Sequence, residues 1–293
     1  MEDFVVLNNG VRMPRVGLGV YAIPVNQTKD AVLTALSLGY RHIDTAQLYK
    51  NEAEVGEAVR ASGIPRKEIF VTTKLWGARD YEDAKRSIAR SQRALGIGVI
   101  DLLLIHWPGE DNLGVYKALE EAYQAGDVRA IGISNFVENL FPSFIKQVDV
   151  VPAVDQVEAH VFCQQKGLRK MMAEAGVVPE AWSPLGSGEH KIFGNPVLES
   201  IAKKHQKSVA QVALRFLVQS GFVIIPRTTK AKHMQENLDV LTFTLDPDDM
   251  KRIESLDNAK SLFGWEGEEN FVGDSEIIAL GGASNETKDR PLG

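Results

Sequence analysis

The chain has 293 residues, of which 44% are hydrophobic and 25% are charged. This length and composition are typical of one large globular unit with a substantial core. The formal net charge of −6 gives no electrostatic support for a nucleic-acid partner.

Location is suggested by three features of the sequence. Cys163 is the single cysteine, so no intramolecular disulfide can form and a reducing compartment is expected. The first ten residues, MEDFVVLNNG, are acidic and lack the basic and apolar regions of a signal peptide. No apolar run approaches the roughly 18 residues of a membrane-spanning helix. We therefore expect a cytoplasmic protein with no membrane partner.

The predicted elements alternate along the chain. Two short apolar runs flank Asn9-Gly10 and predict a β-hairpin with a tight turn. Strands are then predicted at 16–20, 41–44, 69–74, 100–106, 128–134, 152–157, 177–182 and 222–226. Helices are predicted at 28–38, 51–62, 81–95, 113–125, 137–146, 165–175, 196–220 and 230–240. The stretch 196–220 should divide near Lys207-Ser208, because Ser208 and Gln211 have the pattern of a capping box.

This alternation predicts the fold class. Apolar strands that alternate with helices indicate a parallel sheet covered on its outer face, and eight such repeats predict an α/β fold, a (β/α)8 TIM barrel of about 250 residues. A doubly wound sheet is the alternative, but Gly17-Leu-Gly19 does not continue as G-x-G-x-x-G. We expect a single barrel over residues 1–265. Residues 266–293, rich in glycine and acidic residues, are expected to form a flexible C-terminal tail.

Four polar residues stand where a barrel would place its active site. Asp44, Lys74 and His106 end predicted strands, and Tyr49 lies on the loop after the second strand. The carboxyl ends of barrel strands meet at one mouth. The ordinary pKa of tyrosine, near 10, is too high for easy proton donation, and a nearby ammonium lowers it. We predict that Lys74 does so, that Asp44 holds Lys74, and that His106 orients a carbonyl group.

Each of these residues also has an ordinary structural explanation. An Asp–Lys pair is usually only an ion pair, a histidine after a strand usually satisfies local hydrogen bonds, and a tyrosine usually packs. The arrangement of all four at predicted strand ends favours a catalytic site instead. The histidines show no spacing typical of metal ligands, and this acid–base set needs no metal, so none is expected.

The chain resembles the aldo-keto reductase family from about Val6 to about Asp257. The segments that carry the resemblance are, in chain order, GYRHIDTAQLYKNE, VTTKLW, LLLIHWP, AIGISNF and DQVEAH. The resemblance implies a catalytic tetrad of Asp44, Tyr49, Lys74 and His106, with Tyr49 as the proton donor. It also implies NADP(H) as the hydride source, reduction of aldehydes and ketones to alcohols, and a monomer.

The nicotinamide end of the cofactor is assigned by the same resemblance. Ser134, Asn135 and Gln156 end strands, and their hydroxyl and amide groups suit a carboxamide. Ser134 and Asn135 are also of residue types that cap a following helix. Trp182 ends the seventh strand, and its indole can stack on a nicotinamide. A tryptophan at this position resembles a subset of the family, the small-carbonyl and prostaglandin F reductases.

By resemblance, Ser183 and Leu185 line the pyrophosphate. The segment 225–237 after the eighth strand is basic, as barrel phosphate sites often are. Arg227, Thr228 and His233 would hold the 2′-phosphate, and Glu236 and Asn237 would contact the adenine. His233 stands where the family usually has arginine, which weakens the charge, but NADPH remains favoured over NADH. Asp155 stands where the family commonly has asparagine.

A small-molecule carbonyl substrate is expected at an apolar mouth formed by Tyr21, Trp76 and Trp107 beside His106. The family's C-terminal loop leans over this mouth, which makes Phe263, Trp265 and Phe271 candidate pocket residues. Two other functions stay open. The chain could be a nucleotide-binding barrel that acts as a sensor or structural protein, or the same site could convert a prostaglandin endoperoxide without using Tyr49.

Overall fold

The computed structural model describes residues 3–186 and 192–263. Eight parallel strands form one sheet, and strands that are consecutive in the chain are neighbours in the sheet. They are β3 (Leu18–Gly19), β4 (His42–Asp44), β5 (Phe70–Leu75), β6 (Leu102–Ile105), β7 (Ile131–Ser134), β8 (Val154–Glu158), β9 (Val178–Trp182) and β10 (Val223–Ile224). A parallel bridge between Val16 and Ile224 joins the first and last strands. The predicted (β/α)8 barrel is confirmed.

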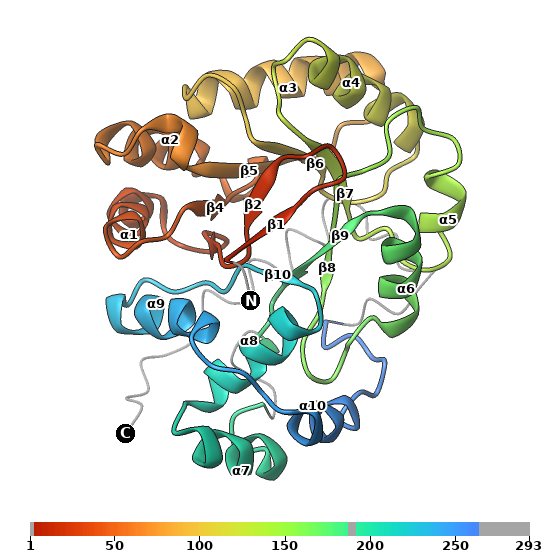
Figure 1. The fold of residues 1–293 in the computed structure, drawn as a ribbon. Helices are drawn as coiled ribbons and strands as arrows, with labels where there is room; N and C mark the ends of the chain where they lie inside the picture. Colours follow the sequence, from red (N-terminus) through yellow and green to blue (C-terminus); the bar gives the residue numbers. More distant parts are fainter. Residues whose placement is uncertain (1–2, 187–191, 264–293) are drawn as a thin grey trace.

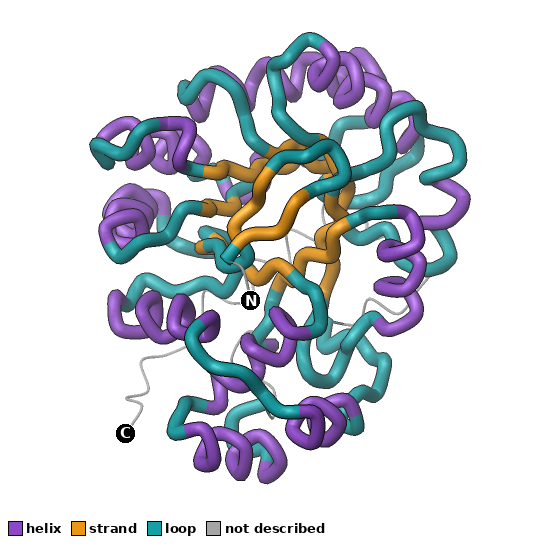
Figure 2. The backbone as a smooth tube through the Cα atoms, in the orientation of Figure 1, coloured by secondary structure: helices purple, strands orange, loops and turns teal. Residues whose placement is uncertain are grey.

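Helices surround the strands on the outside (Figures 1 and 2). They are α1 (Val25–Ser37), α2 (Glu52–Ala61), α3 (Tyr81–Leu95), α4 (Asn112–Gln124), α5 (Phe141–Phe144), α6 (Lys166–Ala175), α7 (Pro196–His205), α8 (Val209–Gln219), α9 (Ala231–Leu238) and α10 (Pro247–Glu254), with 3₁₀ turns η1 (Gln47–Tyr49), η2 (Arg66–Glu68) and η4 (Asp239–Leu241). Helix α3 shows how the sequence sets the face and the ends of these helices. Ala84, Ile88 and Leu95 recur on its buried face, Asp80 caps its start, and Gly96 ends it at a positive φ of 55°.

The predicted hairpin closes one end of the barrel. Strands β1 (Phe4–Val6) and β2 (Arg12–Pro14) pair antiparallel, and Figure 1 shows them lying across the centre of the ring. Leu7 and Met13 are buried in one cluster with Phe70 and Leu102, which stand at the starts of β5 and β6. The hairpin therefore covers the amino-terminal ends of the strands, and the carboxyl ends form the open mouth.

The helices differ from the sequence prediction in two places. Helix α5 covers only Phe141–Phe144 instead of 137–146, because Pro142 is tolerated only in the first turn of a helix. Helix α10 was not predicted, although Asp246, Pro247 and Asp249 carry a capping box with proline in the first turn. The predicted break in 196–220 is confirmed, since α7 ends before Gln206 at a φ of 55° and α8 begins at the predicted capping box of Ser208.

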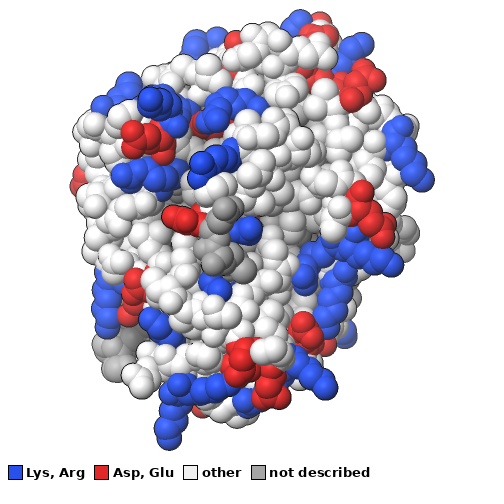
Figure 3. Space-filling model, in the orientation of Figure 1, with Lys and Arg blue, Asp and Glu red and all other residues white. Residues whose placement is uncertain are grey.

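The surface carries both signs of charge. Figure 3 shows lysines and arginines interspersed with acidic residues and separated by uncharged surface on the face that carries the hairpin. Within the described part of the chain, no helix is both long enough and apolar enough to cross a membrane.

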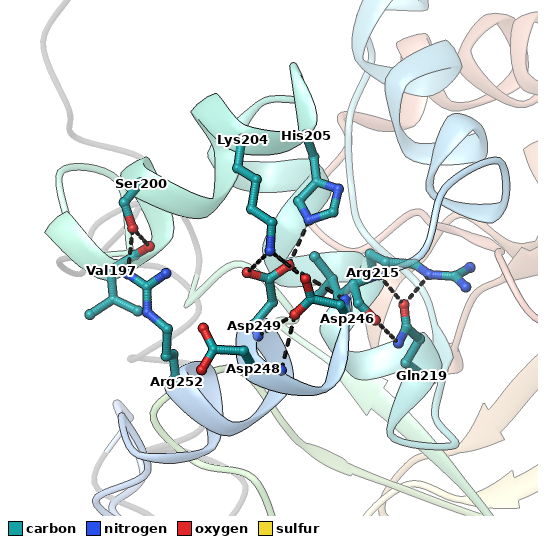
Figure 4. Close-up of polar contacts among 11 residues, drawn as sticks. Val197, Ser200, Lys204, His205, Arg215, Gln219, Asp246, Asp248, Asp249 and Arg252 are labelled. Carbon is teal, nitrogen blue, oxygen red and sulfur yellow. Dashed lines mark hydrogen bonds and ion pairs between the residues drawn. The ribbon is translucent and has the colours of Figure 1, made fainter.

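Helix α10 is held to α7 by a buried carboxylate (Figure 4). Both oxygens of Asp249 lie 2.9 Å from Lys204 Nζ, and Oδ2 lies 2.6 Å from His205 Nε2. Lys204 also pairs with Asp246, the N-cap of α10. Burial alone would raise the pKa of Asp249, but the bonds from His205 and Lys204 lower it below its usual value.

We expect Asp249→Asn to lower the free energy of unfolding by about 2 kcal/mol at pH 7, because it weakens charge-assisted hydrogen bonds at a buried position. Urea denaturation measures this loss. The matched control is Asp248→Asn, since Asp248 lies one residue away but is exposed. Its expected change is within about 0.5 kcal/mol. Equal losses in both variants would contradict a specific role for the Asp249 cluster.

Candidate active site

The four predicted catalytic residues converge at the mouth of the barrel around one ammonium group. Lys74 Nζ lies 2.6 Å from Asp44 Oδ1, 3.0 Å from the carbonyl oxygen of Thr45 and 3.2 Å from the hydroxyl of Tyr49. These contacts use all three donors of the ammonium. Asp44 and Lys74 belong to neighbouring strands β4 and β5, and Tyr49 comes from η1, so the barrel topology alone brings them together.

Burial sets the charge of the Lys74–Tyr49 pair. Burial alone would lower the pKa of Lys74, but Asp44 and Tyr49 more than offset this effect and the pKa lies above its usual value. For Tyr49, burial raises the pKa to about 12, and Lys74 opposes this rise only in part. The predicted lowering of the tyrosine pKa is therefore wrong as a net effect, because desolvation of the phenolate outweighs the ammonium. Tyr49 keeps its proton at neutral pH, as a proton donor must.

His106 contributes a neutral imidazole to the same mouth. Burial, followed by the charge of Lys74, lowers its pKa well below the usual value. Its Nδ1 is buried and has no hydrogen-bond partner among the described residues. A bare nitrogen is tolerated there better than an N–H without an acceptor, which favours the tautomer with the proton on Nε2. The His106 ring lies 5.6 Å from Tyr49 and 5.1 Å from Trp76 between centroids.

Two of the predicted substrate residues, Tyr21 and Trp76, contact these two rings. Tyr21 lies edge-on to Tyr49 at 5.0 Å between centroids, and Trp76 and Trp107 are both half-buried. Phe263 packs against Trp182 at 5.3 Å. Of the residues predicted to lie over the mouth, Trp265 and Phe271 are outside the described ranges.

Two residues outside the predicted set shape the site. The side-chain oxygen of Gln47 accepts from the backbone amide of Trp76 at 3.1 Å, and its nitrogen donates to Ser91 of α3 at 2.7 Å, which fastens the turn that carries Tyr49. Glu158, at the end of β8, accepts from the backbone amide of Leu262 at 2.8 Å and so anchors the segment that carries Phe263. Both lie in segments that carry the family resemblance, but only the fold reveals their partners.

Ser134 and Asn135 form part of the rim of the barrel. Ser134 Oγ donates to the carbonyl oxygen of Gln156 at 2.7 Å, and Asn135 Nδ2 donates to the carbonyl oxygen of His106 at 3.0 Å. Asn135 Oδ1 accepts from Trp182 Nε1 at 2.8 Å, which fixes the orientation of the indole. The alternative that these residues cap a following helix is wrong, because α5 begins at Phe141 and Leu140 precedes it without a side-chain cap.

Gln156 reaches into the barrel interior. Its Nε2 donates to Asp44 Oδ2 at 2.9 Å and to Glu180 Oε2 at 2.8 Å. Both protons of the amide are therefore used by carboxyl groups, and the atom that Gln156 can offer to a ligand is its oxygen. Glu180 was missed by the sequence reasoning. The available signal was a lone carboxylate in the strand VVPEAW, at a position whose side chain is fully buried.

The predicted phosphate residues gather around the start of α9. This helix has Lys230 at its N-cap without a side-chain hydrogen bond, so its first backbone N–H groups can serve an anion. Arg227 is exposed, and its guanidinium lies 3.4 Å from the carbonyl oxygen of Ala22. Thr228 Oγ1 accepts from the backbone amide of Lys230, and His233 is exposed.

The residues predicted for the adenine lie on α9 itself, whereas those predicted for the pyrophosphate follow β9. Glu236 is half-buried and pairs with Lys232 at 3.8 Å, while Asn237 is buried. Ser183 has a positive φ of 47° after β9, and Leu185 is half-buried beside the core. The amide and hydroxyl groups of the rim together with a basic helix start fit a phosphorylated nicotinamide dinucleotide.

The comparisons with known proteins agree with this geometry. The model of the aldo/keto reductase family matches residues 15–258. The 9,11-endoperoxide prostaglandin H2 reductase of Trypanosoma cruzi (strain CL Brener) is 46% identical over 264 residues, which cover 89% of this chain and 93% of that protein. The glyoxal reductase of Bacillus subtilis (strain 168) is 42% identical, with 87% and 93% covered.

A solved structure of a mutant of Gox0644 in complex with NADPH has a TM-score of 0.83 and 38% identity, and the match covers 92% of this chain and 97% of that one. The chain therefore belongs to the aldo/keto reductase family of oxidoreductases.

Asp155 lies beside Gln156 on β8, where successive side chains point to opposite faces of the sheet. Its side chain is fully buried, and neither carboxyl oxygen makes a hydrogen bond of good geometry within the described residues, although the backbone amide of Phe136 is close enough to lower its pKa in part. Burial raises the pKa of Asp155 well above its usual value. The buried position therefore favours the protonated form of this carboxyl group in the folded protein.

This acid makes stability depend on pH. The unfolded chain loses the Asp155 proton above about pH 4, whereas the folded protein holds it, so stability falls as the pH rises toward the folded pKa. We expect Asp155→Asn to remove this loss. Its stability relative to wild type should increase with pH between 5 and 8, by up to about 1.4 kcal/mol per pH unit. Urea denaturation at several pH values measures the difference.

The control is Glu174→Gln, which removes one carboxylate from the exposed face of α6. Its difference from wild type should change little over the same range. A pH-independent difference for Asp155→Asn would show that Asp155 does not keep its proton on folding.

Proposed function

We propose that this protein reduces aldehydes and ketones to alcohols with NADPH, and that Asp44, Tyr49, Lys74 and His106 perform the catalysis. The observation that carries the proposal is the contact of the buried Lys74 ammonium with both Asp44 and the hydroxyl of Tyr49, at 2.6 and 3.2 Å. Family membership supports it, as does the NADPH complex of the similar Gox0644 structure.

The residues divide the proton chemistry between them. Bound NADPH supplies a hydride to the carbonyl carbon. His106 donates a hydrogen bond from Nε2 to the carbonyl oxygen and turns it toward Tyr49. Tyr49 gives its proton to that oxygen as the carbon–oxygen π bond breaks, and Lys74 stabilises the phenolate that remains. Asp44 keeps Lys74 charged and in place. The tyrosine then recovers a proton from solvent.

The cofactor would lie across the mouth from the rim to α9. Asn135, Ser134 and Gln156 would hold the carboxamide, and Trp182 would stack on the nicotinamide. Ser183 and Leu185 would line the pyrophosphate, while Arg227, Thr228 and His233 would hold the 2′-phosphate and Glu236 and Asn237 the adenine. Tyr21, Trp76 and Trp107 would surround a small carbonyl substrate. A cytoplasmic monomer is the proposed form, and the single cysteine supports a reducing compartment.

A second activity has a specific observation in its favour. The Trypanosoma cruzi relative at 46% identity is a reductase of a prostaglandin endoperoxide. We therefore propose that the mouth also admits an endoperoxide, and that turnover of this substrate does not require Tyr49. A sensor or structural role is the remaining alternative, and the intact tetrad argues against it.

We expect Tyr49→Phe to lower the rate of carbonyl reduction by at least about 100-fold, because the proton donor is lost. The affinity for NADPH should stay within about twofold, because the phenyl ring keeps its packing. The assay follows NADPH oxidation with an aromatic aldehyde, methylglyoxal, another α-dicarbonyl and a quinone. The same variant is assayed with prostaglandin H2.

Tyr123→Phe is the control, since Tyr123 lies on α4, away from the mouth. Near-normal carbonyl reduction by Tyr49→Phe would disprove the assigned role of the tyrosine. NADPH binding by the wild type without turnover of any substrate would favour a sensor.

We expect Arg227→Ala to weaken NADPH binding by about tenfold or more, because a charge-assisted contact with the 2′-phosphate is lost. NADH lacks this phosphate and serves as the internal control, so its affinity should change little. Calorimetric titration of both coenzymes measures the ratio. An equal loss for NADPH and NADH would place Arg227 outside the 2′-phosphate site.

A further inference from the structure

A second carboxyl group lies behind the catalytic ion pair. Glu180 faces the barrel interior from β9, directly across from Gln156 of β8 in the strand register, and its side chain is fully buried. Its Oε2 accepts from Gln156 Nε2 at 2.8 Å. Nothing in the reaction described above uses Glu180, and a buried acid in a barrel core is costly unless a partner requires it.

The polar contacts form one continuous network through the barrel. Tyr49 contacts Lys74, Lys74 contacts Asp44 Oδ1, and Asp44 Oδ2 accepts from Gln156. Glu180 is the last residue of this network and accepts the second N–H of the Gln156 amide. Asp44 is thereby held on both oxygens, and the amide nitrogen is held between two acceptors that come from separate strands of the barrel, β4 and β9.

This arrangement determines which atom of Gln156 remains for a ligand. A planar amide whose nitrogen lies between two carboxyl oxygens must direct its own oxygen away from both. We propose that Glu180 is a positioning residue for the cofactor: by fixing the amide of Gln156, it presents the amide oxygen as an acceptor for the N–H of the nicotinamide carboxamide. This inference rests on the proposed function, which places the carboxamide at Gln156.

Glu180 acts as an acceptor and does not need its charge. Burial, followed by the neighbouring Asp44, raises the pKa of Glu180 to about 8, which favours its protonated form. The Lys74 ammonium opposes this rise. His42 Nε2 also lies 3.7 Å from Glu180 Oε1, and burial lowers the pKa of His42 to about 3, which keeps it neutral. A glutamine at position 180 would supply an equivalent acceptor oxygen, whereas a leucine would not.

The test compares three probes by calorimetric titration of each variant. NADP⁺ carries the carboxamide, its acetylpyridine analogue has a methyl ketone that donates no hydrogen bond, and adenosine 2′,5′-bisphosphate lacks the nicotinamide altogether. We expect the wild type to prefer NADP⁺ to the analogue. Glu180→Leu should reduce that preference about fivefold to tenfold, the cost of one hydrogen bond, while Glu180→Gln retains it.

Two controls separate positioning from a general structural effect. Affinity for adenosine 2′,5′-bisphosphate should be the same in every variant, because the phosphate cluster at α9 is untouched. Asp155→Asn, a change to a buried carboxyl group on the opposite face of β8, should leave the preference intact. In a double-mutant cycle, Glu180→Leu should have no further effect on the preference once Gln156→Ala is present.

Several outcomes would overturn the proposal. These are an unchanged preference in Glu180→Leu, a loss in Glu180→Gln as large as that in Glu180→Leu, an effect additive with Gln156→Ala, or an equal loss of bisphosphate affinity. Failure of the proposed function has a different signature, since the wild type would then neither bind NADP⁺ nor reduce a carbonyl with NADPH.

Discussion

Lys74 carries a positive charge at a position where its side chain has no exposed surface, and the mouth of the barrel is organised around the need to satisfy it. A buried ammonium that lacks partners would be costly enough to shift its pKa or unfold the site. Asp44, the Thr45 carbonyl and the Tyr49 hydroxyl provide one acceptor for each of its three protons. The requirement for stability and the requirement for proton transfer are thus met by the same contacts.

The chemistry follows from unequal effects of burial on the neighbouring groups. Burial keeps Tyr49 protonated and His106 neutral, so the mouth presents two uncharged hydrogen-bond donors beside one fixed cation. The cation stabilises the phenolate only when the proton has left, which is a preference for the transition state over the ground state. A solvent-exposed version of the same residues would lack this preference, because water would screen the ammonium.

The network of polar contacts extends beyond the residues at the mouth. Gln156 and Glu180 extend it across the barrel to β9, and Gln47 and Glu158 fasten the loops that carry Tyr49 and Phe263. Barrel strands are short here, with only two residues in β3 and β10, so little of the mouth is held by sheet pairing alone. Side-chain contacts between separate loops therefore supply much of the rigidity that a hydride acceptor site requires.

Local periodicity and the positions at which strands end were enough to predict the repeating strands and helices, the hairpin and the four residues at the mouth. Tertiary structure decided what those residues experience. Burial, which no local pattern reports, reversed the expected direction of the Tyr49 pKa and raised the pKa of Asp155. The pairing of Glu180 with Gln156 arises only when β8 and β9 align and the barrel closes. Contacts between residues far apart in the chain set the local dielectric and the available partners, so they decided the chemistry.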